Sequence, residues 1–252
     1  MLKQLAEDLK DKQIYDIPKR INDIETYTKE RIEYLSSNFG DYSEEYQFYD
    51  KSEEFLASLK ENKARFVIIS IDVVGSTKMS QELSIEKKSK IIQLFSREIS
   101  QLINSFDGYV LKFLGDGIIA YFPEPNYLGM KDNAINSAHS IKYFIINGLN
   151  KIFNNNGLPS INFRIGLDSG EAMILIVGSK ESKTHKDLIG KTINLATKIQ
   201  GLAKPNQILA GETTITNAHY LYRTWFDKII LSEYWNYLKD NELKYQVFAS
   251  KF

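Results

Sequence analysis

Two aspartates could do chemistry in this chain because each stands where a run of strand-forming residues stops. Asp72 lies near the end of "RFVIISIDVVGST" (65–77), whose apolar run suggests a central strand buried on both faces. Asp116 lies in the Gly-Asp-Gly of "VLKFLGDGIIAYF" (110–122), which predicts a β-hairpin whose tight turn uses glycine for a positive φ. Turn chemistry alone is a sufficient explanation of Asp116 when it is considered by itself.

The elements around the two aspartates are expected to bring them together. Helical apolar spacing occupies 80–106 before the hairpin and 130–155 after it, and 161–178 reads as a strand, a glycine turn and a further strand. The resulting order, β-α-β-β-α-β, is that of an α+β, ferredoxin-like core. In this arrangement the first strand ends beside the hairpin tip, so Asp72 and Asp116 are expected to lie within a few ångströms.

Paired carboxylates and the segment after them predict a metal and phosphate site. Two unpaired carboxylates repel unless a cation lies between them, and hard oxygen ligands suit Mg²⁺ or Mn²⁺. The amides of Gly75, Ser76 and Thr77 lie at a predicted helix N-terminus, where phosphate oxygens bind readily. Together these features indicate nucleotide phosphoryl chemistry, in which two metal ions activate a nucleophile and stabilise leaving pyrophosphate.

Composition excludes several other classes of function. Among the 252 residues, 32 basic side chains balance 32 acidic ones, which disfavours a nucleic-acid-binding protein. The absence of cysteine excludes disulfides, thiolate metal sites and a cysteine nucleophile. The charged N-terminus does not resemble a signal peptide, and no apolar run could insert into a membrane, so a cytoplasmic protein is expected. His139, His185 and His219 lack ligand spacing and are interpreted as structural or surface residues.

The segments outside the core have a less specific pattern. Residues 1–60 predict short amphipathic helices broken near Pro18 and at 38–46. This N-terminal helical extension could pack on the main domain or serve dimerisation or partner binding. Beyond the core we expect a helix at about 191–202 between short strands, and edge strands near 225–231 and 245–249.

Four motifs of the chain resemble class III nucleotidyl cyclases, the adenylate and guanylate cyclase catalytic domain. "FVIISIDVVGST", "KFLGDG", "FRIGLDSGE" and "DLIGKTINLATKI" occur in the order and spacing of that family, over about residues 64–249. Four motifs in register are specific, whereas a single Gly-Asp-Gly would not be. The resemblance implies that residues 64–252 form the cyclase catalytic domain.

The resemblance also implies a role for each matching residue on the metal side of the site. Asp72 and Asp116 resemble the aspartates that bind two Mg²⁺ or Mn²⁺ ions, with the carbonyl of Val73 reaching a metal. Arg164 resembles the arginine that holds the polyphosphate from the same subunit. From the residues alone, Arg164 could instead extend from its strand into solvent.

A second set of residues would act from the other subunit of a head-to-tail homodimer. Lys112 and Asp187 match the pair that reads adenine, the lysine at N1 and the aspartate at the amino group, and Asn194 matches the residue that positions the ribose. Lys198 stands where the family has a transition-state arginine, so the charge remains but the bidentate fork is lost. Lys239 resembles a late phosphate-binding lysine, with a one-residue gap in the match.

Simpler interpretations of this second set remain open. Lys112 alternates with Leu111 and Phe113, so it is expected to face away from those two, and it could be an exposed strand lysine. Asp187 could be a loop charge, and Asn194 a polar surface residue or helix cap.

The resemblance leaves the substrate base open. The short chain resembles the Pycsar bacterial anti-phage cyclases, which make cyclic CMP or cyclic UMP and so favour a pyrimidine substrate. Lys112 and Asp187 favour ATP instead, and an adenylate cyclase is the alternative. A catalytically silent, nucleotide-binding homologue is a further hypothesis, against which both metal aspartates are present.

Overall fold

A computed structural model describes residues 23–39, 48–59, 62–123, 129–178, 185–239 and 242–252. The predicted β-α-β-β-α-β order is confirmed. Its strands pair in the order β2-β3-β1-β4, which is the ferredoxin-like arrangement. The core elements are β1 (Lys63–Val74), α4 (Ser76–Glu82), α5 (Ile85–Ser105), β2 (Tyr109–Leu114), β3 (Gly117–Pro123), α6 (Gly129–Phe144), the π-helical turn η1 (Ile145–Leu149), α7 (Asn150–Asn155) and β4 (Asn162–Val177).

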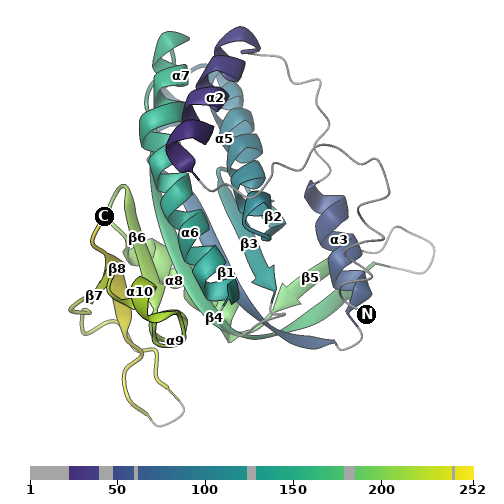
Figure 1. Cartoon of the computed structure of the whole chain (residues 1–252), viewed down its shortest axis with the longest axis vertical. Helices are drawn as coiled ribbons and strands as arrows, with labels where there is room; N and C mark the ends of the chain where they lie inside the picture. The colour runs from purple at the N-terminus through teal and green to yellow at the C-terminus, as the bar shows by residue number, and fades with distance from the viewer. Residues whose placement is uncertain (1–22, 40–47, 60–61, 124–128, 179–184, 240–241) are drawn as a thin grey trace.

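Both faces of the central sheet are covered, as expected for the apolar run in β1. Val67, Ile69 and Ile71 pack into a cluster with α5, α6 and α7, whose helices lie together in Figure 1. Phe66 and Ile68 point to the opposite face, in a second cluster. The second cluster joins β1 to α3 (Phe48–Ser58) and α8 (Lys191–Leu202). Asp72 follows the same alternation and therefore lies on the α3 and α8 side of the sheet.

The glycine turn expected within 161–178 is wrong, because β4 runs on without a break. Gly170 pairs with Phe66 of β1 in the middle of the strand. A Cβ on Gly170 would lie 3.2 Å from the Cβ of Thr192, so this glycine makes room for α8. The chain reverses only beyond Val177, and β5 (His185–Ile189) returns along β4.

The helical pattern over 80–106 forms two helices. α4 ends at Glu82, and the side chain of Ser84 caps α5 by accepting a hydrogen bond from the backbone N–H of Lys87 at 3.4 Å. The break therefore has a local signal, a serine before a helical segment.

The described helices of the N-terminal segment pack on the domain, on opposite faces of the sheet. α2 (Ile24–Ser37) buries Leu35 against the α5–α7 cluster, and its Arg31 binds the fully buried Glu98 through two bonds of 2.6 and 2.9 Å. α3 buries Leu56 against the other face. The break expected near Pro18 lies outside the described residues.

The C-terminal elements extend the sheet in the order β4-β6-β8-β7. They are β6 (Gln207–Gly211), α9 (Glu212–Thr216), α10 (Tyr220–Arg223), β7 (Phe226–Lys228) and β8 (Val247–Ser250). The predicted helix over 191–202 and the edge position of β7 are confirmed. β8 is not an edge strand, because it lies between β6 and β7. No helix in the described ranges is long and apolar enough to cross a membrane.

Candidate active site

The pairing of β1 with β3 places Asp72 next to the loop that contains Asp116. Asp72 pairs with Gly117, the residue directly after Asp116. Gly115 and Asp116 form the two-residue loop between β2 and β3, and Gly115 supplies the positive φ of 65°. The pairing of β1 with β3 ends here, whereas its pairing with β4 continues through Val73 and Val74.

The two carboxylates have different partners. The Oδ2 atom of Asp72 accepts a hydrogen bond from Arg164 Nη2 at 2.5 Å and a longer one from Gln200 Nε2 at 3.4 Å. The Oδ2 atom of Asp116 is shielded from solvent and has no hydrogen-bond partner among the described residues. Burying a carboxylate oxygen without a partner costs free energy, which a bound cation or hydrogen-bond donor would offset.

The donor set fits a hard divalent cation. It offers carboxylate oxygens from Asp72 and Asp116, with the backbone of Val73 adjacent. No group of three or more His, Cys, Asp or Glu side chains suited to a metal occurs in the described part of the chain. Remaining ligands would therefore come from water or from substrate phosphates, as is usual for Mg²⁺.

Arg164 lies against Asp72 because the two residues are register partners in β1 and β4. Its side chain is about a third exposed (32%) and that of Asp72 about a quarter (26%), so solvent reaches this ion pair. The Nε atom of Arg164 is shielded and lacks a partner in the described part of the chain. The guanidinium therefore has unused donor capacity beside the two carboxylates.

The segment after β1 has the predicted form. Gly75 adopts the left-handed conformation (φ 77°) as the N-cap of α4, and Ser76 and Thr77 form the first turn. A Cβ at position 75 would meet no atom within 4 Å, so a lack of space does not require glycine here. The positive φ does.

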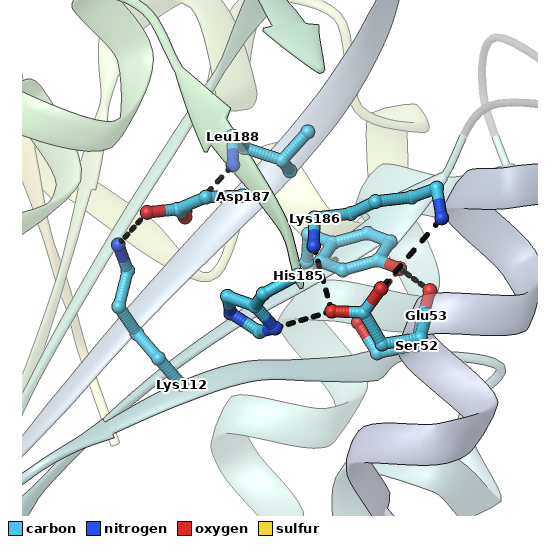
Figure 2. A network of polar contacts seen from close by, with 8 residues as sticks. Ser52, Glu53, Lys112, His185, Lys186, Asp187 and Leu188 are labelled. Carbon is cyan, nitrogen blue, oxygen red and sulfur yellow. Dashed lines mark hydrogen bonds and ion pairs between the residues drawn. The ribbon is translucent and has the colours of Figure 1, made fainter. Parts of the chain in front are cut away.

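Lys112 and Asp187 are joined by an ion pair of 2.6 Å from β2 to β5, as Figure 2 shows. The expectation that Lys112 faces away from both Leu111 and Phe113 is wrong. A β-bulge at Leu111 lets Lys112 pair with Ile119, so Leu111 and Lys112 share the α3 and α8 side while Phe113 packs on the other. The bulge thus re-aims the lysine toward Asp187.

Asn194 and Lys198 are exposed one turn apart on the outer face of α8. No hydrogen bond or ion pair of either side chain occurs within the described part of the protein. The helix packs closely on the sheet at Gly166, where a Cβ would come within 2.3 Å of the backbone nitrogen of Gln200. α8 can therefore present both side chains outward while its inner face touches β4.

Lys239 is paired with Glu212 at 2.8 Å rather than joined to the other candidate residues. Its neighbour Leu238 accepts a hydrogen bond from Lys191 at the start of α8. Within the described ranges, no hydrogen bond or ion pair connects the Asp72, Asp116 and Arg164 group with Lys112, Asp187, Asn194, Lys198 or Lys239.

Three polar residues near these elements were not singled out from the sequence: Glu53, Asp168 and Gln200. Gln200 lies on the buried face of α8, and its helical position among apolar neighbours is a signal that could have identified it. Of the three histidines, His139 is half-buried beside Trp225 and Phe226, and desolvation lowers its pKa to about 4, in keeping with a structural residue.

Asp168 of β4 forms hydrogen bonds to α8, to α9 and to the segment just before β8. Its carboxyl group accepts hydrogen bonds from Tyr245, Thr192 and Thr213 at 2.5 to 3.1 Å. Burial nevertheless raises the pKa of Asp168 from its ordinary 3.8 to about 7. The folded state therefore holds this proton more tightly than the unfolded state does.

The free energy of unfolding is expected to fall with pH because of this group. Its contribution is complete below about pH 4 and is lost as pH rises to about 7, a change of roughly 4 kcal/mol for a three-unit shift. Urea unfolding at pH 5 and pH 8 measures the part of this change that lies above pH 5, about 3 kcal/mol. Asp168→Asn, which does not titrate, should lose less stability over this interval than the wild type, and an equal loss in both would contradict the assignment.

Comparisons with known proteins identify the family and the fold of this chain. Residues 59–230 match the family described as the adenylate and guanylate cyclase catalytic domain. A cytidylate cyclase of Staphylococcus aureus is 29% identical over 147 residues, which cover 56% of this chain and 34% of that protein. The chain thus spans about a third of that relative's length.

Solved structures show the same fold. The adenylyl cyclase CyaB of P. aeruginosa superposes with a TM-score of 0.64 at 17% identity, over 77% of this chain and 97% of the other. The guanylyl cyclase Cya2 gives a TM-score of 0.64 at 21% identity, over 76% and 93%. Because the family match covers more than half of the sequence, this chain belongs to the class III adenylate and guanylate cyclase catalytic domain family.

Proposed function

We propose that the protein is a metal-dependent nucleotidyl cyclase that converts a nucleoside triphosphate into a 3′,5′-cyclic nucleotide. The 3′-hydroxyl loses its proton to solvent and its oxygen forms a bond to the α-phosphorus. The bond from that phosphorus to the bridging oxygen breaks, and pyrophosphate leaves with the electron pair. The observation that carries the proposal is the placement of Asp72 beside the Gly115–Asp116 loop, with Asp116 Oδ2 shielded and without a partner in the described chain.

Each residue on the metal side has a role that follows from its position. Asp72, Asp116 and the Val73 carbonyl would hold two Mg²⁺ or Mn²⁺ ions. When bound, these ions lower the pKa of the attacking hydroxyl and neutralise phosphate charge. Arg164 would turn its donors to the polyphosphate. The first turn of α4 (Gly75, Ser76 and Thr77) offers amides to phosphate oxygens.

The Lys112–Asp187 pair supports recognition of a base with an amino group. Lysine donates and aspartate accepts, so the pair suits a ring nitrogen acceptor beside an exocyclic amino donor. Cytosine and adenine both present this pattern. The relative named a cytidylate cyclase favours CTP, and we therefore propose the pyrimidine nucleotide CTP as the substrate, with ATP as the second candidate.

A head-to-tail homodimer would complete the site. Asn194 and Lys198 point outward from α8, while the metal-side residues lie at the end of β1. The β4–β5 hairpin also exposes apolar side chains that a second copy would cover: Met173, Leu175, Ile176, Val177 and Ile189. One subunit would supply the metal side, and its partner the base, ribose and transition-state contacts. In that site Asn194 would orient the ribose, and Lys198 and Lys239 would bind phosphate.

The substrate is tested directly by incubating the purified protein with Mn²⁺ and each of ATP, GTP, CTP and UTP. The products are separated and identified by mass. We expect cyclic CMP and pyrophosphate in equal amounts. Cyclic AMP as the main product would select the second candidate, and no cyclic product from any of the four would contradict cyclase activity.

A further inference from the structure

α3 lies before the segment that matches the cyclase family, yet it contacts both strands that carry the candidate base-reading pair. The helix ends at Ser58, and the match begins at residue 59. It packs against β2, which bears Lys112, and against β5, which bears Asp187. An element outside the matched segment is therefore placed to set the distance between these two side chains.

The helix is firmly attached to the β2–β3 hairpin. Ser52 Oγ and the hydroxyl of Tyr121 share a buried hydrogen bond of 3.0 Å. Phe55 stacks on Tyr109 of β2, with ring centres 4.6 Å apart. Leu56 is buried in the cluster that also contains Leu188 of β5. α3 is thus held against the hairpin that carries Lys112.

Glu53 extends this attachment to β5. Its carboxylate accepts a hydrogen bond from the backbone N–H of Lys186 at 2.7 Å, pairs with His185 Nδ1, and lies 3.8 Å from Lys186 Nζ. Figure 2 shows Glu53 reaching these residues from α3, while Asp187 points to Lys112 on the other side of β5. Among the described strands β5 pairs with β4 alone, so no strand pairs with its other edge. The Glu53 carboxylate accepts the hydrogen bond that the Lys186 backbone N–H would otherwise donate to a neighbouring strand.

We propose that Glu53 is a positioning residue for base recognition, which holds β5 so that Asp187 meets Lys112. Lys186 and Asp187 are consecutive, so a displacement of the Lys186 backbone moves the Asp187 carboxylate with it. Leu188 N–H donates to Asp187 Oδ1 at 2.8 Å, which further ties that side chain to the strand. This inference rests on the proposed function of the Lys112–Asp187 pair.

The first test compares substrate selectivity in Glu53→Ala with that in the wild type. Removing a charge-assisted acceptor is expected to lower the ratio of kcat/KM for the best triphosphate to that for the others about tenfold, mainly through KM. Glu53→Gln keeps an oxygen for Lys186 N–H and should recover most of the selectivity. Glu54→Ala, an exposed acidic neighbour on the same helix, is the matched control and should behave as wild type.

The second test does not depend on activity. Hydrogen exchange of the Lys186 and Leu188 amides should become about tenfold faster in Glu53→Ala, with the centre of β1 unchanged. An equal loss of activity on all four triphosphates, or unchanged exchange in β5, would overturn the proposal. If the wild type yields no cyclic product, the proposed cyclase function fails, and exchange in β5 still decides whether Glu53 positions the strand.

Discussion

Replacing Asp72 or Asp116 with asparagine is expected to abolish formation of the cyclic nucleotide, with kcat reduced roughly 10³-fold or more. Asparagine preserves size and one oxygen but removes the negative charge that a divalent cation requires. At Asp116 the effect can be assigned most directly to a lost metal ligand, because its shielded Oδ2 atom has no hydrogen-bond partner in the described chain that the substitution would disrupt. Product formation with saturating Mn²⁺ and the preferred triphosphate measures the effect.

The fold should survive both substitutions. Asp72 and Arg164 form a solvent-accessible pair, so the loss of its charge should change the free energy of unfolding by only about 1 kcal/mol. Asp227→Asn, at an exposed acid on β7, is the matched control and should keep full activity. Substantial turnover by either active-site variant would show that the two aspartates do not hold the catalytic metals.

Two inactive variants are expected to restore activity when they are combined. One carries Asp116→Asn on the metal side, and the other carries Asn194→Ala together with Lys198→Ala on α8. Each mixed dimer has one of its two sites intact, so the purified mixed dimer should have about half of wild-type activity. Differently tagged chains, co-expressed and purified through both tags, give the mixed dimer for assay.

The control for this experiment combines two variants from the same side of the site. Asp72→Asn with Asp116→Asn should remain inactive, because no mixed dimer then contains an intact metal side. If the first combination also stays inactive while mixed dimers are recovered, then each site is built from a single chain, and the head-to-tail arrangement is wrong.

The core of the fold was predictable because its signals are local. Alternation and apolar spacing located β1, the β2–β3 hairpin and α8, and the order of these elements placed Asp72 beside Asp116. The turn predicted within 161–178 was wrong because a glycine within an apolar run favours a turn. In the structure Gly170 stays in the strand and makes room for Thr192. The bulge at Leu111 has no local signal, since it depends on how β2 pairs with β3.

The polar contacts of the site were less accessible to sequence reasoning. Arg164 meets Asp72 because two strands pair in one register, and the residues are 92 positions apart. Glu53 reaches Lys186 over 133 positions, from a helix that carries no motif. A motif identifies the residues that face the substrate, but contacts between distant elements decide how those residues are held.

The central claim is that Asp72 and Asp116 jointly bind a divalent cation next to a triphosphate. The most direct measurement is a crystal structure with Mn²⁺ and a non-cyclisable triphosphate analogue, with manganese located by its anomalous scattering. The account predicts manganese bonded to carboxylate oxygens of both aspartates, with Arg164 turned from Asp72 to the phosphates. Manganese bound elsewhere, with the Arg164–Asp72 pair intact beneath the nucleotide, would contradict it.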